Sequence, residues 1–232
     1  MPRPVAPASK VVPTSEHYEV RPLAPGVWAA LHRPGGWAIC NAAIVDLGGR
    51  TLVADPGMTP ESGEDLGRLA GELTGRPPDF VALTHYHNDH VRGAQGLPSV
   101  AVFASEETRR LLETRGVEEL ISDRNHAEAG LARARAAAAS AVPEIRAHGV
   151  LAITYWEALA ATAARCGVPK PDVTFEQEMW FHGSDRSTHL LSLGTAHTPD
   201  DAVLVVPDSG VVFCADLLFV RFHPYFADGD PD

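Results

Sequence analysis

The sequence predicts an α/β fold, because short apolar runs typical of strands alternate with segments typical of helices. An alanine-rich segment with few β-branched residues then indicates a helical insert, and strand-like runs return after it. The hydrophobic fraction of 45% is enough for a sizeable core. Periodicity alone therefore supports an α/β domain with several strands, interrupted by helices.

The first predicted elements are three strands that form a meander, at residues 26–31, 37–47 and 50–54. Gly48-Gly49 between the last two predicts a tight hairpin. Asp55 ends the meander and is followed by Pro-Gly. A helix is predicted over 59–73, because a capping threonine, a proline and an acid open it and Gly75 ends it.

Two continuous apolar runs, at residues 80–83 and 100–103, predict strands that are covered on both faces. Ser105 caps a helix after the second run, and Gly116 is predicted to close it. Strands and helices in this order indicate parallel strand pairing with crossover helices.

Residues 117–167 are predicted to form two or three helices, broken near Pro143 and Gly149. This insert is a candidate lid in which Tyr155, Trp156 and Leu159 could line an apolar pocket, although helix packing is the use that we favour for them. The strands that follow are predicted at 173–181, 189–193, 202–206 and 211–215.

Charge and composition restrict the partners. A net charge of −11 lacks the basic footprint of nucleic-acid binding, so we expect a small-molecule substrate and no nucleic acid. No apolar run is long enough for a transmembrane helix and the start has no apolar signal core, so we expect no membrane association and a cytoplasmic location. Residues 1–16 are proline-rich and polar and are predicted to form a disordered arm. The three cysteines have no disulfide or CxxC spacing.

The run Thr84-His85-Tyr86-His87-Asn88-Asp89-His90 carries the strongest chemical signal. It follows a predicted buried strand and places three imidazoles and a carboxylate within one turn of chain. These groups are good ligands for zinc, iron or manganese. The two-residue spacing directs His85 and His87 the same way, and Asp89 and His90 must turn toward a second position. One loop could therefore serve two adjacent metal ions.

Two further residues follow strands elsewhere in the chain. His197 lies in a turn after a predicted strand, and Asp216 closes the apolar run 211–215. Active sites of α/β folds collect at strand ends along one edge of a sheet, so we expect both residues to join the motif. Cys214 would share a strand face with Asp216, and core packing is its favoured interpretation over a ligand role.

These motifs resemble the metallo-β-lactamase superfamily, in the order histidine cluster, lone histidine, strand-end aspartate. The segments Thr-His-Tyr-His-Asn-Asp-His-Val-Arg-Gly and Ala-His-Thr-Pro-Asp-Asp look most like general hydrolases of that superfamily. The resemblance runs from about residue 23 to 232 and implies a single domain, residues 17–232, with the insert at about 117–167. It also implies a four-layer αβ/βα sandwich, with two mixed sheets face to face and helices outside.

The resemblance further implies a role for each site residue. His85, His87 and His197 would hold a first metal, Asp89 and His90 a second, and Asp216 would bridge the two. Asp55 matches an aspartate that supports the ligands from behind. The expected cofactor is zinc, two ions, with iron or manganese as alternatives.

The implied activity is that of a metallo-hydrolase, in which a metal-bound hydroxide attacks an ester, thioester, lactone or amide without a covalent intermediate. Asp89 would orient the nucleophile and pass a proton to the leaving group. An alternative within the same superfamily is an iron dioxygenase that oxidises sulfur substrates.

One departure from the superfamily pattern concerns the end of the sequence. The superfamily normally continues past the bridging aspartate through a further helix and strand to a glycine-histidine motif, and residues 217–232 contain none. We therefore expect a chain truncated at its C-terminus, without the last βα portion. Its second metal site would then be weak, or the chain would be an inactive metal-binding fragment with exposed apolar surface that favours homo-oligomers. His223 is not expected to be a ligand.

Overall fold

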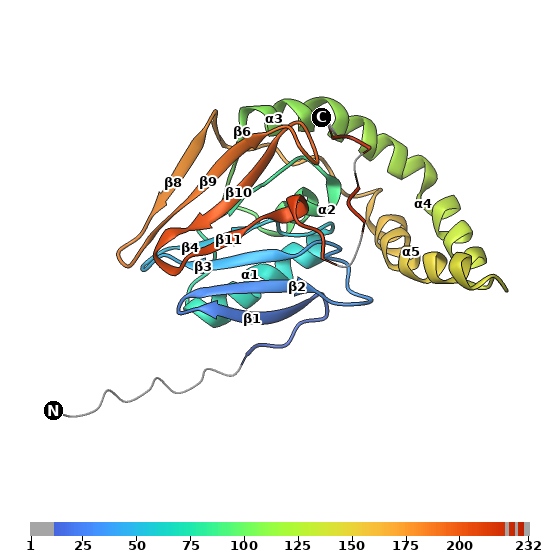
Figure 1. Ribbon diagram of the computed structural model, residues 1–232, viewed down its shortest axis with the longest axis horizontal. Helices are drawn as coiled ribbons and strands as arrows, with labels where there is room; N and C mark the ends of the chain where they lie inside the picture. The colour runs from blue at the N-terminus through green and yellow to red at the C-terminus, as the bar shows by residue number, and fades with distance from the viewer. Residues whose placement is uncertain (1–11, 221–222, 226, 230–232) are drawn as a thin grey trace.

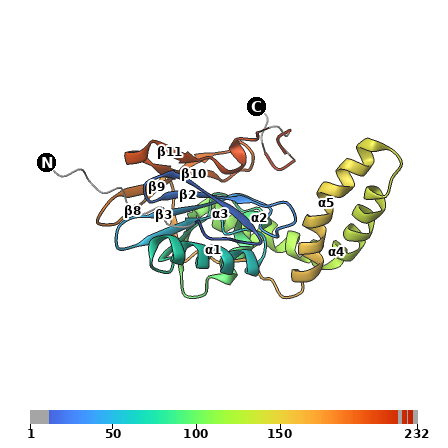
Figure 2. The same ribbon diagram turned by 90° about the horizontal axis from the view of Figure 1, so that it is seen from below.

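The computed structural model describes residues 12–220, 223–225 and 227–229. Two sheets lie face to face, and a pair of long helices projects from one end of the sandwich (Figures 1 and 2). This arrangement confirms the predicted α/β class with a helical insert between two groups of strands. No helix of the described residues is long and apolar enough to cross a membrane.

The larger sheet has seven strands in the order β1 to β7. The first four pair antiparallel, and β4 to β7 pair parallel, as the crossover pattern predicts. Its strands are β1 Tyr18–Ala24, β2 Val27–His32, β3 Ala42–Asp46, β4 Thr51–Ala54, β5 Phe80–Ala82, β6 Ala101–Ser105 and β7 Val173–Phe175. Gly48 and Gly49 have φ of 80° and 74°, which form the predicted hairpin turn.

Strand β1 is not among the predicted elements. It is the edge strand of the sheet, where proline is tolerated, and Pro22 lies beside a register shift in the pairing with β2. Glu19 and Arg21 are exposed, whereas Tyr18 and Val20 are buried in the core. Of the predicted N-terminal arm, residues 1–11 lie outside the described part of the chain. Ser15 is described and buried, and its hydroxyl accepts a hydrogen bond from the backbone N–H of Tyr18 at 2.7 Å.

Helix α1 (Pro60–Thr74) covers the outer face of the larger sheet (Figure 2). Thr59 and Ser62 form a capping box at its start, and Gly75 ends it in the left-handed conformation at φ 83°. The predicted helix limits are therefore right to within one residue. The core on this face packs the leucines of α1 against strands of the sheet.

The predicted end of a helix at Gly116 is wrong. Helix α3 (Glu106–Leu111) passes through a π-helical turn (Leu112–Gly116) directly into α4 (Val117–Ala138). Gly116 has helical dihedrals, φ −61° and ψ −36°, and not the left-handed conformation that ends helices. Leu111, Leu112 and Leu120 stay buried along the continuous helix, and this packing favours continuation over the glycine's intrinsic preference.

The predicted break near Pro143 is correct, since α5 (Pro143–Thr162) begins at that residue, but the break at Gly149 is wrong. Gly149 lies inside α5, and a Cβ atom there would come within 2.2 Å of the backbone nitrogen of Ala138. The glycine therefore allows α4 and α5 to approach closely as a helical hairpin. Helix propensity marks glycine only as a helix breaker, so it does not reveal a close contact between two helices.

The smaller sheet has four strands in the order β11-β10-β9-β8. They are β8 Glu178–His182, β9 Ser187–Gly194, β10 Asp201–Val206 and β11 Val211–Phe213. The predicted single strand 173–181 is wrong, because β7 belongs to the larger sheet and β8 to the smaller one. A second core fills the space between the sheets, where the rings of Phe80, Phe103 and Phe181 meet. Among the described residues, no helix lies on the outer face of the smaller sheet (Figure 2).

Candidate metal centre

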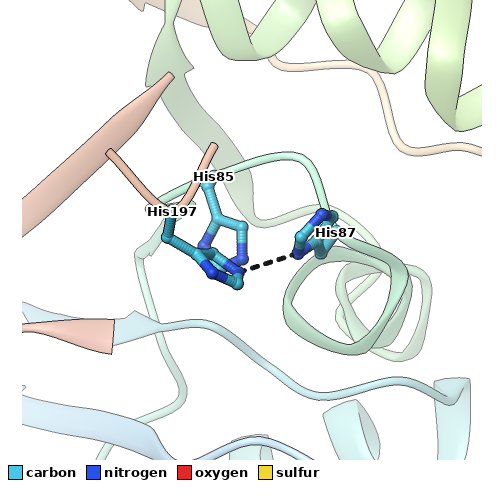
Figure 3. Close-up of side chains that lie close together, drawn as sticks. All are labelled: His85, His87 and His197. Atoms are coloured by element: carbon cyan, nitrogen blue, oxygen red, sulfur yellow. Dashed lines mark hydrogen bonds between the residues drawn. The ribbon is translucent and has the colours of Figure 1, made fainter. Parts of the chain in front are cut away.

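The segments that carry the predicted site residues meet at the end of the sandwich next to the helical hairpin of α4 and α5 (Figure 1). His85 and His87 follow β5, with short helix α2 (Asn88–Val91) after them, His197 follows β9, and Asp216 follows β11. Ligand atoms of His85, His87 and His197 lie within 4.8 Å of one another (Figure 3), and those of His85, His90 and Asp216 form a second such group. The structure thus brings together side chains that are 131 positions apart at most, from residue 85 to residue 216.

The hydrogen bonds of His85 determine which of its ring nitrogens is free. Thr84 Oγ1 donates to the Asp55 carboxylate at 2.7 Å, because an ionised carboxylate can only accept. Thr84 Oγ1 must then accept from His85 Nδ1–H at 3.0 Å. This assignment leaves a lone pair on His85 Nε2, which is buried and has no hydrogen-bond partner among the described residues. Such an orphaned acceptor costs free energy unless a cation binds it.

His197 and His87 present lone pairs to each other by the same reasoning. His197 Nδ1–H donates to the backbone carbonyl of Tyr225 at 2.7 Å, so His197 Nε2 carries the lone pair. His87 Nε2–H donates to Asp228 at 3.3 Å, which leaves the lone pair on His87 Nδ1. His197 Nε2 and His87 Nδ1 are 3.1 Å apart (Figure 3). Two facing lone pairs at this distance repel unless a proton or a metal ion lies between them.

His90 faces two carboxylates beyond the three-histidine group. Its Nδ1–H donates to Asp55 at 2.9 Å, and its Nε2 is 3.2 Å from Asp216 and 3.7 Å from Asp89. The other carboxylate oxygen of Asp216 lies 3.5 Å from His197 Nε2. Asp216 therefore lies between the two groups of ligand atoms, in the position expected of a bridging carboxylate.

Burial and neighbouring charges shift the pKa values of these groups in opposite directions. Burial, together with the surrounding histidines, lowers the pKa of His85 well below its usual value, and burial lowers that of His87. Burial also disfavours charge on His90, but the acidic groups around it, Asp89, Asp55 and Asp216 among them, raise its pKa well above the usual value. Burial opposes ionisation of Asp216, but His90 and His197 keep the pKa of this carboxyl below its ordinary value.

The residues present fit a metal ion on the chemistry of their donor atoms. Three imidazole lone pairs converge on one point, and a fourth imidazole with the Asp216 carboxylate and His85 forms an adjacent group. Neutral imidazole and carboxylate are ligands that zinc accepts, and histidine ligands typically donate their second N–H to a carboxylate or carbonyl, as His87, His90 and His197 do here. Asp89 is the one predicted ligand whose oxygens belong to neither close group.

The family model described as Metallo-beta-lactamase superfamily matches residues 35–232. The chain belongs to this superfamily. Its fold resembles solved metallo-beta-lactamases from Pontibacter korlensis, at 19% identity with TM-score 0.61, and from Hirschia baltica, at 16% with TM-score 0.53. These alignments cover 92% and 86% of this chain, and 80% and 71% of the respective relatives. Metallo-beta-lactamase IND-7 is similar at 12% identity with TM-score 0.61, over 94% of this chain and 80% of its own. The comparison with curated proteins found no match.

Membership of the metallo-beta-lactamase superfamily confirms the expected sandwich of two sheets. Asp55 lies behind the two groups of ligand atoms in the structure. It has φ 51°, and its carboxylate accepts from Thr84 N–H, Thr84 Oγ1–H and His90 Nδ1–H. One aspartate therefore orients a ligand of each group.

A cavity of about 350 Å³ opens onto both groups of ligand atoms. Its walls include Ile39, Tyr155 and Glu119 beside the ligands, and burial raises the pKa of Glu119 to about 8. The helical hairpin reaches the histidine motif here, since Asn88 donates to Asp123 and to the Tyr155 hydroxyl, each at 3.2 Å.

Of the three residues of the candidate lid, two pack among the helices, which is the favoured prediction, and one lines the cavity. Tyr155 lines the cavity, but Trp156 packs on Gly130 between the helices and Leu159 is fully buried beneath them. Most of the residues that line the cavity have polar or charged side chains. Cys214 and His223 belong to neither group of ligand atoms.

Two residues at the site escape sequence reasoning, Tyr225 and Asp228. Tyr225 acts through a backbone carbonyl, so its side chain gives no signal. Asp228 lies 141 positions from His87, and only the return of the chain over the site brings them together.

Proposed function

We propose that this protein is a metal-dependent hydrolase that binds two zinc ions. His85, His87 and His197 would hold the first ion, and Asp89 and His90 would hold the second. Asp216 would contribute its carboxylate to both. The observation that supports this best is the convergence of imidazole lone pairs whose orientation is fixed by Thr84, Asp55 and the Tyr225 carbonyl.

Bound zinc lowers the pKa of a coordinated water to about 7 and polarises a substrate carbonyl. The residues of the chain supply orientation and proton transfer. Asp89 borders the cavity and lies within 3.7 Å of His90, so its carboxylate can accept a proton from the attacking water and return it to the leaving group. Glu119 borders the same cavity, and burial raises its pKa to about 8, so a protonated carboxyl at this position can donate a hydrogen bond to a substrate oxygen.

The substrate class that we propose is a small ester, thioester, lactone or amide. A cavity of about 350 Å³ accommodates a small molecule, and a net charge of −11 disfavours nucleic acid. We also propose a cytoplasmic location.

Metal analysis of the purified native protein, combined with hydrolysis assays on chromogenic esters and thioesters, tests the proposal. We expect about two zinc ions per chain and hydrolytic turnover. Replacing His87 with alanine should abolish turnover and remove one equivalent of zinc. About one iron per chain with oxygen consumption would instead favour a sulfur dioxygenase, and turnover retained by the His87→Ala protein would refute the assignment.

A further inference from the structure

We propose that Asp228 is a positioning residue for the first metal site, and this inference rests on the proposed zinc function. Its carboxylate accepts a hydrogen bond from His87 Nε2–H at 3.3 Å and so directs the opposite ring nitrogen toward His85 and His197. Partners of this kind fix the ring orientation of a ligating histidine and increase its basicity.

The other three histidines of the centre each have such a partner as well. Thr84 orients His85, Asp55 orients His90, and the Tyr225 carbonyl orients His197. His87 lies at the start of the short helix α2 and makes no capping hydrogen bond there with its side chain. Among the described residues, Asp228 provides the hydrogen bond that orients the His87 ring from behind.

Asp228 is itself held in place from two sides. Arg115 of the turn before α4 lies 3.7 Å from its second carboxylate oxygen, and the same guanidinium binds the Tyr86 hydroxyl. The neighbouring Gly229 packs on the backbone of the His197 loop, where a Cβ atom would come within 2.1 Å of the Ala196 carbonyl oxygen. A side chain at position 229 would therefore displace the segment that carries Asp228.

Three variants separate a positioning role from a merely structural one. Asp228→Ala removes the acceptor, Asp228→Asn keeps a neutral acceptor of the same shape, and Gly229→Ala displaces the whole segment. Asp208→Ala is the matched control, because it removes an aspartate that pairs with Arg186 at the surface, 3.4 Å away.

The experiment is a calorimetric titration of each metal-free protein with Zn²⁺ alone, together with the absorption spectrum after substitution with Co²⁺. We expect Asp228→Ala to weaken zinc binding at the tighter site by about 10- to 100-fold. We expect Asp228→Asn to recover part of this loss, Gly229→Ala to lose at least as much as Asp228→Ala, and Asp208→Ala to match the wild type. The cobalt bands should shift in Asp228→Ala, while the Tm of the metal-free protein stays within a few degrees of the wild type.

Unchanged zinc affinity in Asp228→Ala would overturn the inference, and a loss confined to Gly229→Ala would assign the effect to the Tyr225 carbonyl instead. Equal loss in the alanine and asparagine variants with a lowered metal-free Tm would show a structural role and overturn it too. A wild-type protein that binds no zinc would overturn both the proposed function and this inference. Zinc binding with the expected order of variants, but without hydrolysis, would support the inference and refute the proposed reaction alone.

Discussion

Replacing Asp55 with asparagine tests the link between the hydrogen-bond network and the metal centre. The carboxylate accepts three hydrogen bonds, from Thr84 N–H at 3.0 Å, Thr84 Oγ1–H at 2.7 Å and His90 Nδ1–H at 2.9 Å. An asparagine has one acceptor oxygen in the same shape, and it tolerates the left-handed backbone at φ 51°. The substitution therefore changes charge and hydrogen bonding while it keeps the local fold.

The size of the effect follows from the donors that lose their partner. A hydrogen bond to a charged group contributes about 1.5–3 kcal/mol, and a buried unpaired donor costs about 1–3 kcal/mol. The amide cannot accept from all three donors, so we expect the metal-free protein to lose about 3 kcal/mol of unfolding free energy. Where the amide NH₂ faces His90, the ring must accept at Nδ1 and carry its proton on Nε2, the atom that faces Asp216 and Asp89.

Two measurements check this prediction. Urea denaturation of the metal-free protein gives the change in unfolding free energy, and zinc titration gives the affinity of each site. We expect the second site to weaken by about 10- to 100-fold, because partners behind a ligand contribute that much. Asp208→Asn, on the surface, should change neither quantity. Two zinc equivalents bound with wild-type affinity by Asp55→Asn would refute the reasoning that hydrogen bonds fix the orientation of His90.

Three further predictions concern stability. Burial raises the pKa of Asp200 to about 6 from 3.8, so the stability that this group contributes is complete below pH 3.8 and is lost as the pH rises through about 6. Asp200→Asn should therefore be more stable than the wild type at pH 7.5, by at most about 3 kcal/mol at 1.36 kcal/mol per pKa unit, with the gain absent at pH 3.5 in urea melts. Gly149→Ala should lower the unfolding free energy by at least about 1–3 kcal/mol, because the new Cβ atom would overpack against Ala138. Gly71→Ala in α1 should raise it by about 0.5–1 kcal/mol, because the nearest atom to the new Cβ is 3.9 Å away. If denaturation gave the opposite order of the two variants, the assigned packing would be wrong. Zinc at about 100 times its Kd should stabilise the protein by about 2.7 kcal/mol per site. At roughly 2–4 °C per kcal/mol, this gain raises the Tm by roughly 5–10 °C. A thermal melt measures the shift, and a chelator should reverse it.

The sequence was informative where one local signal determines the outcome. His85, His87 and His90 lie within six residues, so their joint presence after a buried strand indicates metal chemistry without knowledge of the rest of the fold. Helix α1 has its cap, its proline and its terminal glycine in sequence, and its limits follow from them. The Gly48-Gly49 hairpin is similarly local, because both positive φ values suit glycine.

Features set by tertiary contacts could not be predicted. Residues 173–181 are predicted as one strand, but the chain leaves one sheet for the other at Glu176-Gln177, with no glycine or proline to mark the change. Gly149 resembles a helix breaker in sequence and is a close contact between helices in the fold. Asp228 is one of thirty acidic residues, and only the path of the chain selects it as the partner of His87.

Strained backbone conformations occur at residues around the candidate metal centre. Ile39, Asp55 and Ala215 are three of the four non-glycine residues with positive φ among those described, at 66°, 51° and 46°. Ile39 lines the cavity, Asp55 orients two histidines, and Ala215 precedes Asp216. Such conformations cost about 1–3 kcal/mol each and persist only where surrounding contacts enforce them. Glycine would remove the strain at any of these positions, but it would also release the backbone that aims Asp216 between the two groups of ligand atoms. Three of the four strained residues therefore lie where the metal centre requires a fixed backbone direction, and the fourth, Ser99, lies in the turn before β6.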